Sequence, residues 1–242
     1  MAAAHGSGKS VLVLSGSPRK GGNSDILCDR FVQGAEEAGN RVEKIRVAER
    51  NVGFCRACYA CKGTGSCIVE DDMAGILQKM IDADVIVLAS PVYFYSVDAQ
   101  LKAVIDRTVA RWLEVRDKEF YYIATCAEGE EEAARTTLEC FRGYAACVEG
   151  AVEKGTVLGT GVYEKGEIVG TAAYDQAYRM GLGVRSRDAP GRRPAGRPAQ
   201  EPSGSVMYLR QKGISSPPMP FPMMMRTMNT SASRENTPAE QK

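Results

Sequence analysis

Residues 10–24 read SVLVLSGSPRKGGNS, and this stretch decides the fold. The continuous apolar run at residues 10–15 is typical of a strand buried on both faces. A helix with one apolar stripe is predicted from Ser24, which can cap it, to Ala38, and Gly39 suits the position just past its end. A buried strand that passes through a glycine-rich turn into a helix indicates the first unit of an α/β sheet.

The same alternation continues along the chain. Further strands are predicted at residues 42–47, 84–90, 120–126 and 156–163. Further helices are predicted at residues 72–83, 99–112 and 171–180, and a helical region at 130–154 is interrupted by glycines at 143 and 150. Parallel strands need crossover connections, so this order predicts a mostly parallel sheet with helices on both faces. Ligands of such sheets bind beyond the carboxyl ends of the strands.

Composition divides the chain into three parts. We expect a flexible amino terminus at residues 1–9, one domain at residues 10–182 with a four-cysteine insertion at 55–67, and a disordered tail rich in Pro, Arg and Met at 183–242. The net charge of +1 gives no reason to expect a nucleic-acid or membrane-surface partner. No apolar run reaches the roughly 20 residues that span a bilayer, and none suits a signal peptide, so a cytoplasmic protein is expected.

The turn between the first strand and the first helix carries many hydrogen-bond donors. Its glycines let backbone amides face one point, and the helix amino terminus adds positive potential. The side chains that add donors are Ser15, Ser17, Arg19, Asn23 and Ser24. The turn therefore predicts a site for a phosphate monoester. Gly8-Lys9-Ser10 is rejected as a Walker A loop, because it precedes the strand.

The loop after the third predicted strand reads SPVYFYS, residues 90–96, and contains three aromatic residues. Aromatic side chains at the carboxyl end of a strand, near a phosphate site, suit a flat aromatic cofactor. Backbone groups beside Pro91 could bond the edge of its ring system. The loop therefore favours contact with such a cofactor over simple core packing.

Four of the eight cysteines lie close together, at Cys55, Cys58, Cys61 and Cys67. In a reducing compartment, clustered cysteines indicate metal or redox chemistry. Three thiolates separated by two residues can wrap three corners of a cubane cluster, and Gly63 and Gly65 let the chain turn to bring the fourth. A [4Fe–4S] cluster, a zinc ion and reduced thiols without metal all stay open. The remaining cysteines are expected to be buried thiols: Cys28, Cys126, Cys140 and Cys147.

Four motifs occur in order between residues 10 and 180: SGSPRKGGNS, the four cysteines followed by EDDM, SPVYFYS, and QLKAVIDR at 100–107. Their combination resembles the NADPH-dependent FMN reductase and iron–sulfur flavoprotein families. The resemblance implies a flavodoxin-like three-layer sandwich, with a five-stranded parallel sheet of order 2-1-3-4-5 and FMN at the switch point. The implied phosphate contacts are Ser15, Ser17, Arg19, Asn23 and Ser24. The implied ring contacts are Pro91, Val92, Tyr93 and Phe94, with Thr125 in a third flavin loop.

The resemblance implies an oxidoreductase that moves electrons between NAD(P)H, or a reduced carrier such as ferredoxin, and a small acceptor. FMN would carry the chemistry, so no catalytic side chain is expected, and a [4Fe–4S] cluster on the four cysteines would exchange single electrons with it. A homodimer or larger homo-oligomer is implied. The alternatives are a metal-free NAD(P)H-dependent FMN or quinone reductase, a flavodoxin-type electron carrier, and a zinc-stabilised binding module.

Several polar residues have structural interpretations. His5 is the only histidine and no role is assigned to it, so no serine–histidine–acid arrangement can be built, which argues against hydrolase chemistry. Asp71 and Asp72 are expected to open the following helix, where acidic groups suit the helix dipole. Lys102 and Arg107 are expected to form salt bridges or a subunit contact instead of taking part in catalysis.

Overall fold

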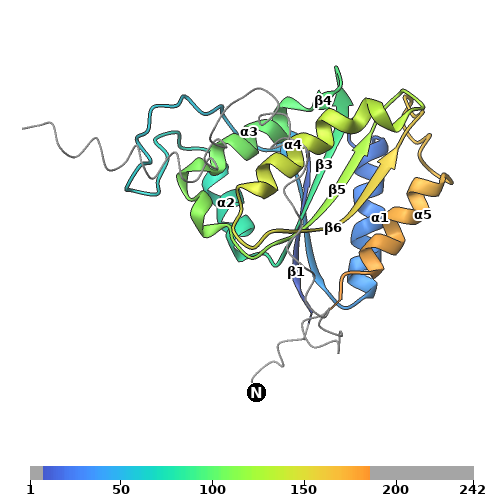
Figure 1. Ribbon diagram of the computed structural model, residues 1–242, viewed down its shortest axis with the longest axis horizontal. Coiled ribbons are helices and arrows are strands. Elements are labelled where there is room, and N and C mark those ends of the chain that lie inside the picture. The colour runs from blue at the N-terminus through green and yellow to red at the C-terminus, as the bar shows by residue number, and fades with distance from the viewer. Residues whose placement is uncertain (1–7, 186–242) are drawn as a thin grey trace, which may run out of the picture. The chain divides into compact units, whose positions relative to one another are not determined.

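The structure is a computed structural model that describes residues 8–185 (Figure 1). Its centre is a sheet in which five strands run parallel in the order β2-β1-β3-β5-β6. These strands are β1 Ser10–Ser15, β2 Arg41–Arg46, β3 Val85–Tyr93, β5 Glu119–Thr125 and β6 Val152–Gly159. The predicted mostly parallel α/β sheet is confirmed.

The predicted strand count of five is wrong, because the sheet has a sixth strand, β4, at Ser96–Val97. Pro91 is the last residue of β3 that pairs with a parallel neighbour; β3 continues through Val92 and Tyr93, and the chain then reverses at Phe94 and Tyr95. The returning strand pairs antiparallel with Val92 and Tyr93. Counted without β4, the parallel strands follow one another in the predicted order 2-1-3-4-5.

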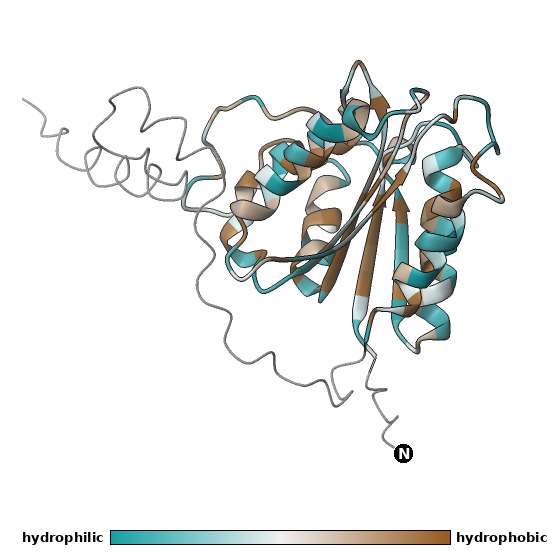
Figure 2. Ribbon diagram, turned by 45° about the vertical axis from the view of Figure 1, so that its right-hand side comes forward, coloured by the Kyte–Doolittle hydropathy of each residue, from teal (hydrophilic) through white to brown (hydrophobic). Residues whose placement is uncertain are grey.

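Helices cover both faces of the sheet, so the predicted three layers are present (Figure 1). One face carries α1 Asn23–Glu37 and α5 Ala172–Leu182, and the other carries α2 Met73–Asp82, α3 Ala99–Arg107 and α4 Arg135–Ala146. Alternate residues of each strand point to opposite faces, which gives two separate apolar cores. Figure 2 shows the result: the central strands are largely hydrophobic, and helices on both faces of the sheet carry hydrophilic sides.

Some element boundaries differ from the predicted ones. α1 begins at Asn23 with Gly22 in the capping position, so Ser24 lies inside the first turn and is not the cap. The predicted helical region at 130–154 consists of a short 3₁₀ turn at Glu131–Ala134 and α4. α4 ends at Ala146, and the chain then turns at Gly150, whose φ is 72°. β6 begins at Val152, four residues earlier than predicted.

Three further 3₁₀ turns complete the described elements, at Val47–Glu49, Thr108–Ala110 and Trp112–Glu114. Gly183 and Val184 follow α5, and Val184 is buried against the face of the sheet covered by α1. Residues 186–242 of the predicted tail and residues 1–7 of the predicted flexible amino terminus lie outside the described residues. Within residues 8–185, no helix is both long and apolar enough to cross a membrane.

Candidate functional site

A pocket of about 270 Å³ opens at the carboxyl ends of the parallel strands. The loops that follow β1, β3, β5 and β6 all contribute to it. Its lining residues are Ser17, Arg19, Gly22, Asn23, Ser24, Pro91, Val92, Tyr93, Phe94, Tyr95, Thr125, Cys126, Ala127, Glu128, Val162 and Tyr163. Nine of the ten residues predicted to contact a cofactor are in this lining; the exception is Ser15.

The loop between β1 and α1, residues 15–22, forms one end of the pocket, and we name it the phosphate loop. Gly16 N donates to Ala89 O at 2.8 Å, and Gly22 N donates to Arg19 O at 3.0 Å, which curls the loop over the end of β3. No side chain caps the amino terminus of α1 at Gly22. The first amides of a helix have no partner within the helix, so this terminus offers donors and positive potential to an anion.

Four of the five predicted phosphate ligands have hydrogen-bond partners within the fold: Ser15, Ser17, Arg19 and Asn23. The Ser15 hydroxyl is buried and donates to Asp25 Oδ1 at 3.2 Å. Asn23 lines the pocket, but its side-chain amide donates to Glu164 O at 2.8 Å and accepts from Gly166 N at 3.0 Å. Asn23 therefore ties the segment after β6 to the phosphate loop.

Arg19 joins the same two segments on the exposed side. Its Nη1 donates to Tyr163 O at 3.0 Å, and its guanidinium lies 5.7 Å from the centre of the Tyr163 ring. The sequence placed Tyr163 in a strand, so its position at the pocket was missed. Because β6 ends at Gly159, the residues after it are free to form a loop beside the site.

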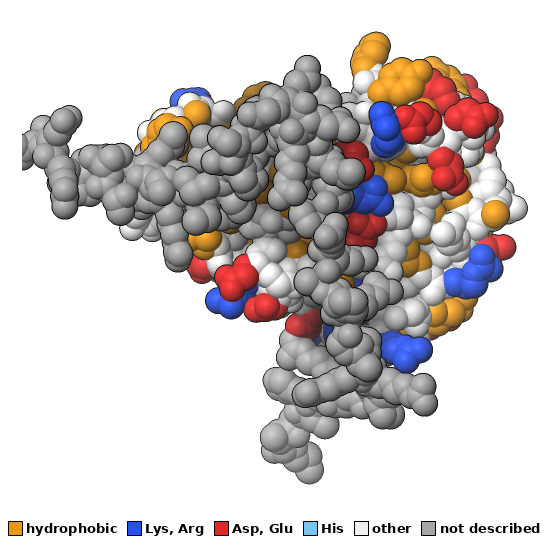
Figure 3. Space-filling model, viewed as in Figure 1, with side chains coloured by type: hydrophobic (Ala, Val, Ile, Leu, Met, Phe, Trp, Pro, Cys, Tyr) orange, Lys and Arg blue, Asp and Glu red, His pale blue; other side chains and the backbone are white. Residues whose placement is uncertain are grey.

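Aromatic side chains form the opposite end of the pocket, where β3 turns into β4. Phe94 and Tyr95 have φ values of 49° and 60°, a conformation that costs about 1–2 kcal/mol for residues other than glycine. Phe94 is completely exposed, at 102%. Figure 3 shows hydrophobic side chains gathered over the ends of β3 and β4 on the visible face. A strained turn that holds an aromatic ring in solvent is a feature of ligand and partner sites.

The third wall is formed by the end of β5 and the loop after it, where Thr125 and Cys126 line the pocket. Cys126 N donates to Gly159 O at 2.9 Å, and Gly161 N donates to Glu128 O at 2.7 Å. These bonds tie the loop to the segment after β6. Burial raises the pKa of the Cys126 thiol, so at neutral pH this side chain is an uncharged part of the wall.

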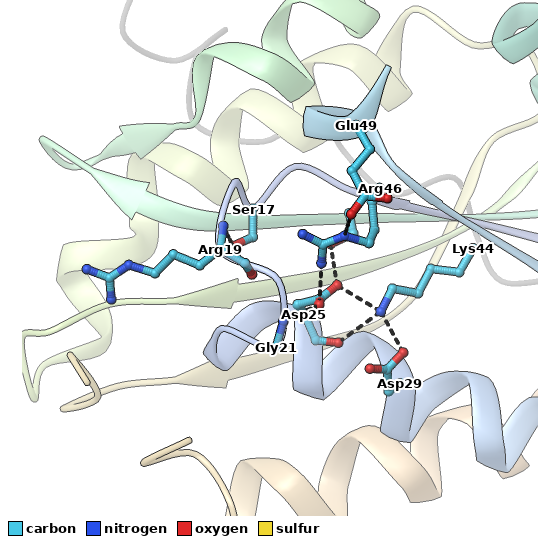
Figure 4. A network of polar contacts seen from close by, with 9 residues as sticks. Ser17, Arg19, Gly21, Asp25, Asp29, Lys44, Arg46 and Glu49 are labelled. Carbon is cyan, nitrogen blue, oxygen red and sulfur yellow. Dashed lines mark hydrogen bonds and ion pairs between the residues drawn. The ribbon is translucent and has the colours of Figure 1, made fainter. Parts of the chain in front are cut away.

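Behind the phosphate loop lies a buried polar network that the sequence interpretation missed (Figure 4). Asp25, in the first turn of α1, accepts from Gly21 N at 2.8 Å and pairs with Lys44 Nζ at 2.8 Å and with Arg46 Nη1. Burial alone would raise the pKa of Asp25, but Lys44 and Gly21 outweigh it and the pKa is lowered. The sequence did contain a signal for this network: Lys44 and Arg46 are two residues apart on β2, so their side chains must project from the same face of the sheet.

The cysteine segment lies between β2 and α2. Gly63 and Gly65 have φ values of 82° and 67°, so the chain turns at both glycines before Cys67. Burial raises the pKa of the Cys61 thiol, and the nearby thiols of Cys67, Cys55 and Cys58 raise it further. The four thiols are thus electrostatic neighbours. Even so, in the part of the chain that the structure describes, no three His, Cys, Asp or Glu side chains are arranged to hold a metal ion.

A buried ion pair anchors both ends of this segment. The side chains of Asp71 and Arg107 are each 2% exposed and form two hydrogen bonds with each other, of 2.8 and 3.0 Å. Arg107 also donates to Gly53 O and Val69 O, at 2.8 and 3.3 Å. The predicted salt-bridging role of Arg107 is confirmed, and Asp71 also accepts from Met73 N at the start of α2, as expected.

The other expected structural residues also have partners. Lys102 pairs with Asp106 one turn along α3, at 2.6 Å. Among the cysteines expected to be buried, Cys28 is fully buried, whereas Cys140 and Cys147 are only partly covered. All eight cysteines are free thiols.

Residues 10–154 match the family model described as NADPH-dependent FMN reductase. Over 99 residues the chain is 38% identical to an iron–sulfur flavoprotein of Archaeoglobus fulgidus, covering 41% of this chain and 44% of that protein. An iron–sulfur flavoprotein of Methanocaldococcus jannaschii is 43% identical over 98 residues, which are 40% of this chain and 51% of that protein. The chain therefore spans about half the length of the curated relatives it matches.

Among solved structures, the fold is similar to that of an NAD(P)H:quinone oxidoreductase from Methanothermobacter marburgensis. The TM-score is 0.58, and the alignment covers 72% of this chain and 96% of that one, at 16% identity. This likeness concerns the arrangement of the sheet and its helices.

Proposed function

Because the chain belongs to the NADPH-dependent FMN reductase family, we propose that it is an FMN-dependent oxidoreductase that takes electrons from NAD(P)H. The single observation that carries the proposal is the pocket at the carboxyl ends of the strands. One of its ends is an uncapped helix terminus with serine hydroxyls, and the other is a strained aromatic turn. A ligand with one phosphate and one flat ring system suits both ends.

Each group of pocket residues has a task in this proposal. Ser17, Ser24 and the first amides of α1 bind the phosphate, and Arg19 adds charge at its outer side. Residues 91–94 and Thr125 contact the ring system. The bound flavin supplies hydride and single-electron chemistry. The protein positions it and limits the access of water. Asn23 acts through its amide bonds to residues 164–168, which hold the wall beside the phosphate.

The binding test is a titration of flavin-free protein with FMN, followed by the quenching of flavin fluorescence. We expect one FMN per chain. The Ser24→Ala variant should bind it about tenfold more weakly, because a hydrogen bond to a charged group is worth roughly 1.5–3 kcal/mol. Ser10→Ala, at the opposite end of β1, is the matched control and should bind like the unchanged protein. Absence of FMN binding by the unchanged protein would refute the proposal.

The activity test is the steady-state oxidation of NADH and NADPH with FMN or a quinone as acceptor. Oxidation that depends on added acceptor and bound FMN is the expected result. A protein that binds FMN but oxidises neither nucleotide would instead be a flavodoxin-type electron carrier.

We further propose that Cys55, Cys58, Cys61 and Cys67 hold a [4Fe–4S] cluster, which would supply single-electron transfer. The donor set suits it: four thiols that influence one another, on a loop with the required turns and anchored at both ends. The names of the curated relatives agree. Among the described residues the four thiols are not arranged as a metal-binding group, so this proposal requires the loop to bring them together around the cluster.

Iron and sulfide analysis of protein purified without oxygen tests the cluster. About four irons per chain are expected, and Cys58→Ser should lose them. Cys147→Ser, outside the segment, is the control and should retain them. Iron-free protein that still binds FMN would favour the metal-free reductase, and zinc in place of iron would favour a structural site.

We also propose a homo-oligomer, supported by the exposed aromatic side chains beside the pocket: Phe94, Tyr95 and Tyr163. Analytical sedimentation should show at least a dimer for the unchanged protein, and the Phe94→Ser variant should dissociate at higher protein concentrations than the unchanged protein. A monomer at all concentrations would contradict this.

The free thiols suit a reducing compartment, so the cytoplasm is the location we propose.

A further inference from the structure

We propose that Asp25 is the positioning residue of the phosphate loop: its carboxylate, fixed by Lys44 and Arg46, keeps residues 15–22 in the shape that receives the FMN phosphate. The proposal rests on the proposed function, since it assigns a role toward FMN. Asp25 is not among the residues that line the pocket, so it acts through others.

Asp25 joins the two ends of the phosphate loop. Its Oδ1 accepts from the Ser15 hydroxyl at 3.2 Å, where the loop leaves β1. Its Oδ2 accepts from Gly21 N at 2.8 Å, just before the loop enters α1. Gly21 has a φ of 64°, so the loop turns at the residue that the carboxylate holds. One side chain therefore links the two ends of the loop.

Strand β2 fixes the position of this carboxylate from the other side (Figure 4). Lys44 Nζ lies 2.8 Å from Oδ1, and Arg46 Nη1 bonds Oδ2. Residues 44 and 46 are two apart on one strand, so their side chains project from the same face. Each carboxylate oxygen thus has one donor from the loop and one cation from β2, which leaves the side chain a single orientation.

The charges explain how a carboxylate can stand behind an anion site. The carboxylate of Asp25 alone would repel a phosphate, but it is paired with the two cations Lys44 and Arg46. All three side chains are largely buried, with exposed fractions of 4%, 16% and 12%. These three buried charges total one negative and two positive. The acids that share the cations are Asp29 and Glu49, whose side chains are 62% and 56% exposed and so more strongly screened by solvent. The buried part of the network therefore keeps a positive excess behind the loop.

This role predicts an effect on the phosphate alone. Riboflavin has the same ring system as FMN but no phosphate, so it needs the aromatic end of the pocket and not the shape of the phosphate loop. The Asp25→Asn variant has the same size but places an amide NH₂ where one oxygen stood. Whichever way the amide turns, this group faces a donor of the loop and a cation.

The test compares the affinities of flavin-free protein for FMN and for riboflavin by fluorescence titration. Asp25→Asn should bind FMN about tenfold more weakly, which corresponds to about 1.4 kcal/mol, and riboflavin almost unchanged. Hydrogen exchange of peptides that cover residues 15–22 should become faster in the same variant. Asp29→Asn is the control: it removes a charge from Lys44 one helical turn away, without touching the loop, and should leave both affinities unchanged.

Equal weakening of FMN and riboflavin binding would make Asp25 a purely structural residue and overturn the proposal. Unchanged FMN binding would overturn it as well. If Asp25→Asn does not fold, Arg46→Met serves instead, because it leaves the carboxylate and removes one of its two cations. An unchanged ratio of FMN to riboflavin affinity in that variant would refute the proposal. A failure of the unchanged protein to bind FMN would count against the proposed function.

Discussion

Replacing Arg107 with Met should release the cysteine segment and destabilise the domain. The arginine is 2% exposed and makes four hydrogen bonds, two to Asp71 and one each to Gly53 O and Val69 O. Met fills a similar volume without these donors. Asp71 would then remain as a buried carboxylate without its cation, although it keeps the bonds from Gly53 N and Met73 N.

The expected cost follows from this burial. Removing one partner of a buried ion pair costs about 3–5 kcal/mol, mainly because the other charge stays desolvated. Small domains have a total stability of about 5–15 kcal/mol, so the loss should be plain in urea unfolding. Asp71→Asn in the Arg107→Met background removes the orphaned charge and should recover part of the loss.

The local effect should lie in the segment that Arg107 anchors. Hydrogen exchange of peptides covering residues 53–70 should become faster, while exchange in the central strands should change only in proportion to global stability. Lys102→Met on the same helix is the control. Its pair with Asp106 is exposed, so the expected loss is about 0–1 kcal/mol. Equal losses for the two variants, or unchanged exchange in the segment, would refute the reasoning.

Three further predictions concern the phosphate loop and the last helix. Gly16→Ala should cost about 1–3 kcal/mol in urea unfolding, because a Cβ there would lie 2.1 Å from Oδ2 of Asp98, which caps α3; stability within error of the parent would contradict it. Thr171→Ala should lower stability by about 1 kcal/mol through loss of the α5 cap, whereas an equally stable Thr171→Ser would support the capping role. The pKa of Asp25 in the folded protein lies below its unfolded value of about 3.9. The contribution of the ionised Asp25 side chain to the free energy of unfolding should therefore be complete above about pH 4 and disappear as pH falls through the folded-state pKa. The stability difference between the parent and Asp25→Asn should follow that course, and a difference that grows on acidification would contradict it.

The predicted features that the structure confirms are local or periodic. β1 occupies residues 10–15, as predicted, because an unbroken apolar run suits a strand between two helical layers. The turn at Gly39 follows α1 with a φ of 85°, which glycine adopts without strain. The start of β6 was misplaced because its first three residues, Val152 to Lys154, are exposed and form no apolar run that would separate them from the preceding helical region.

The sequence by itself determined the parallel sheet and the loops that meet at its carboxyl edge, because the alternation of apolar runs and the glycine positions act over a few residues. The nine predicted residues that line the pocket came from the motifs in these loops and from the family resemblance that the motifs carry. Only the tertiary structure decided which polar side chains meet: Asp25 with Arg46, Arg107 with Asp71, and Asn23 with the segment after β6. Such pairs join residues far apart in the chain, and burial removes the water that would otherwise satisfy each group alone. A residue's type shows what it can bind, and packing decides which partner it has.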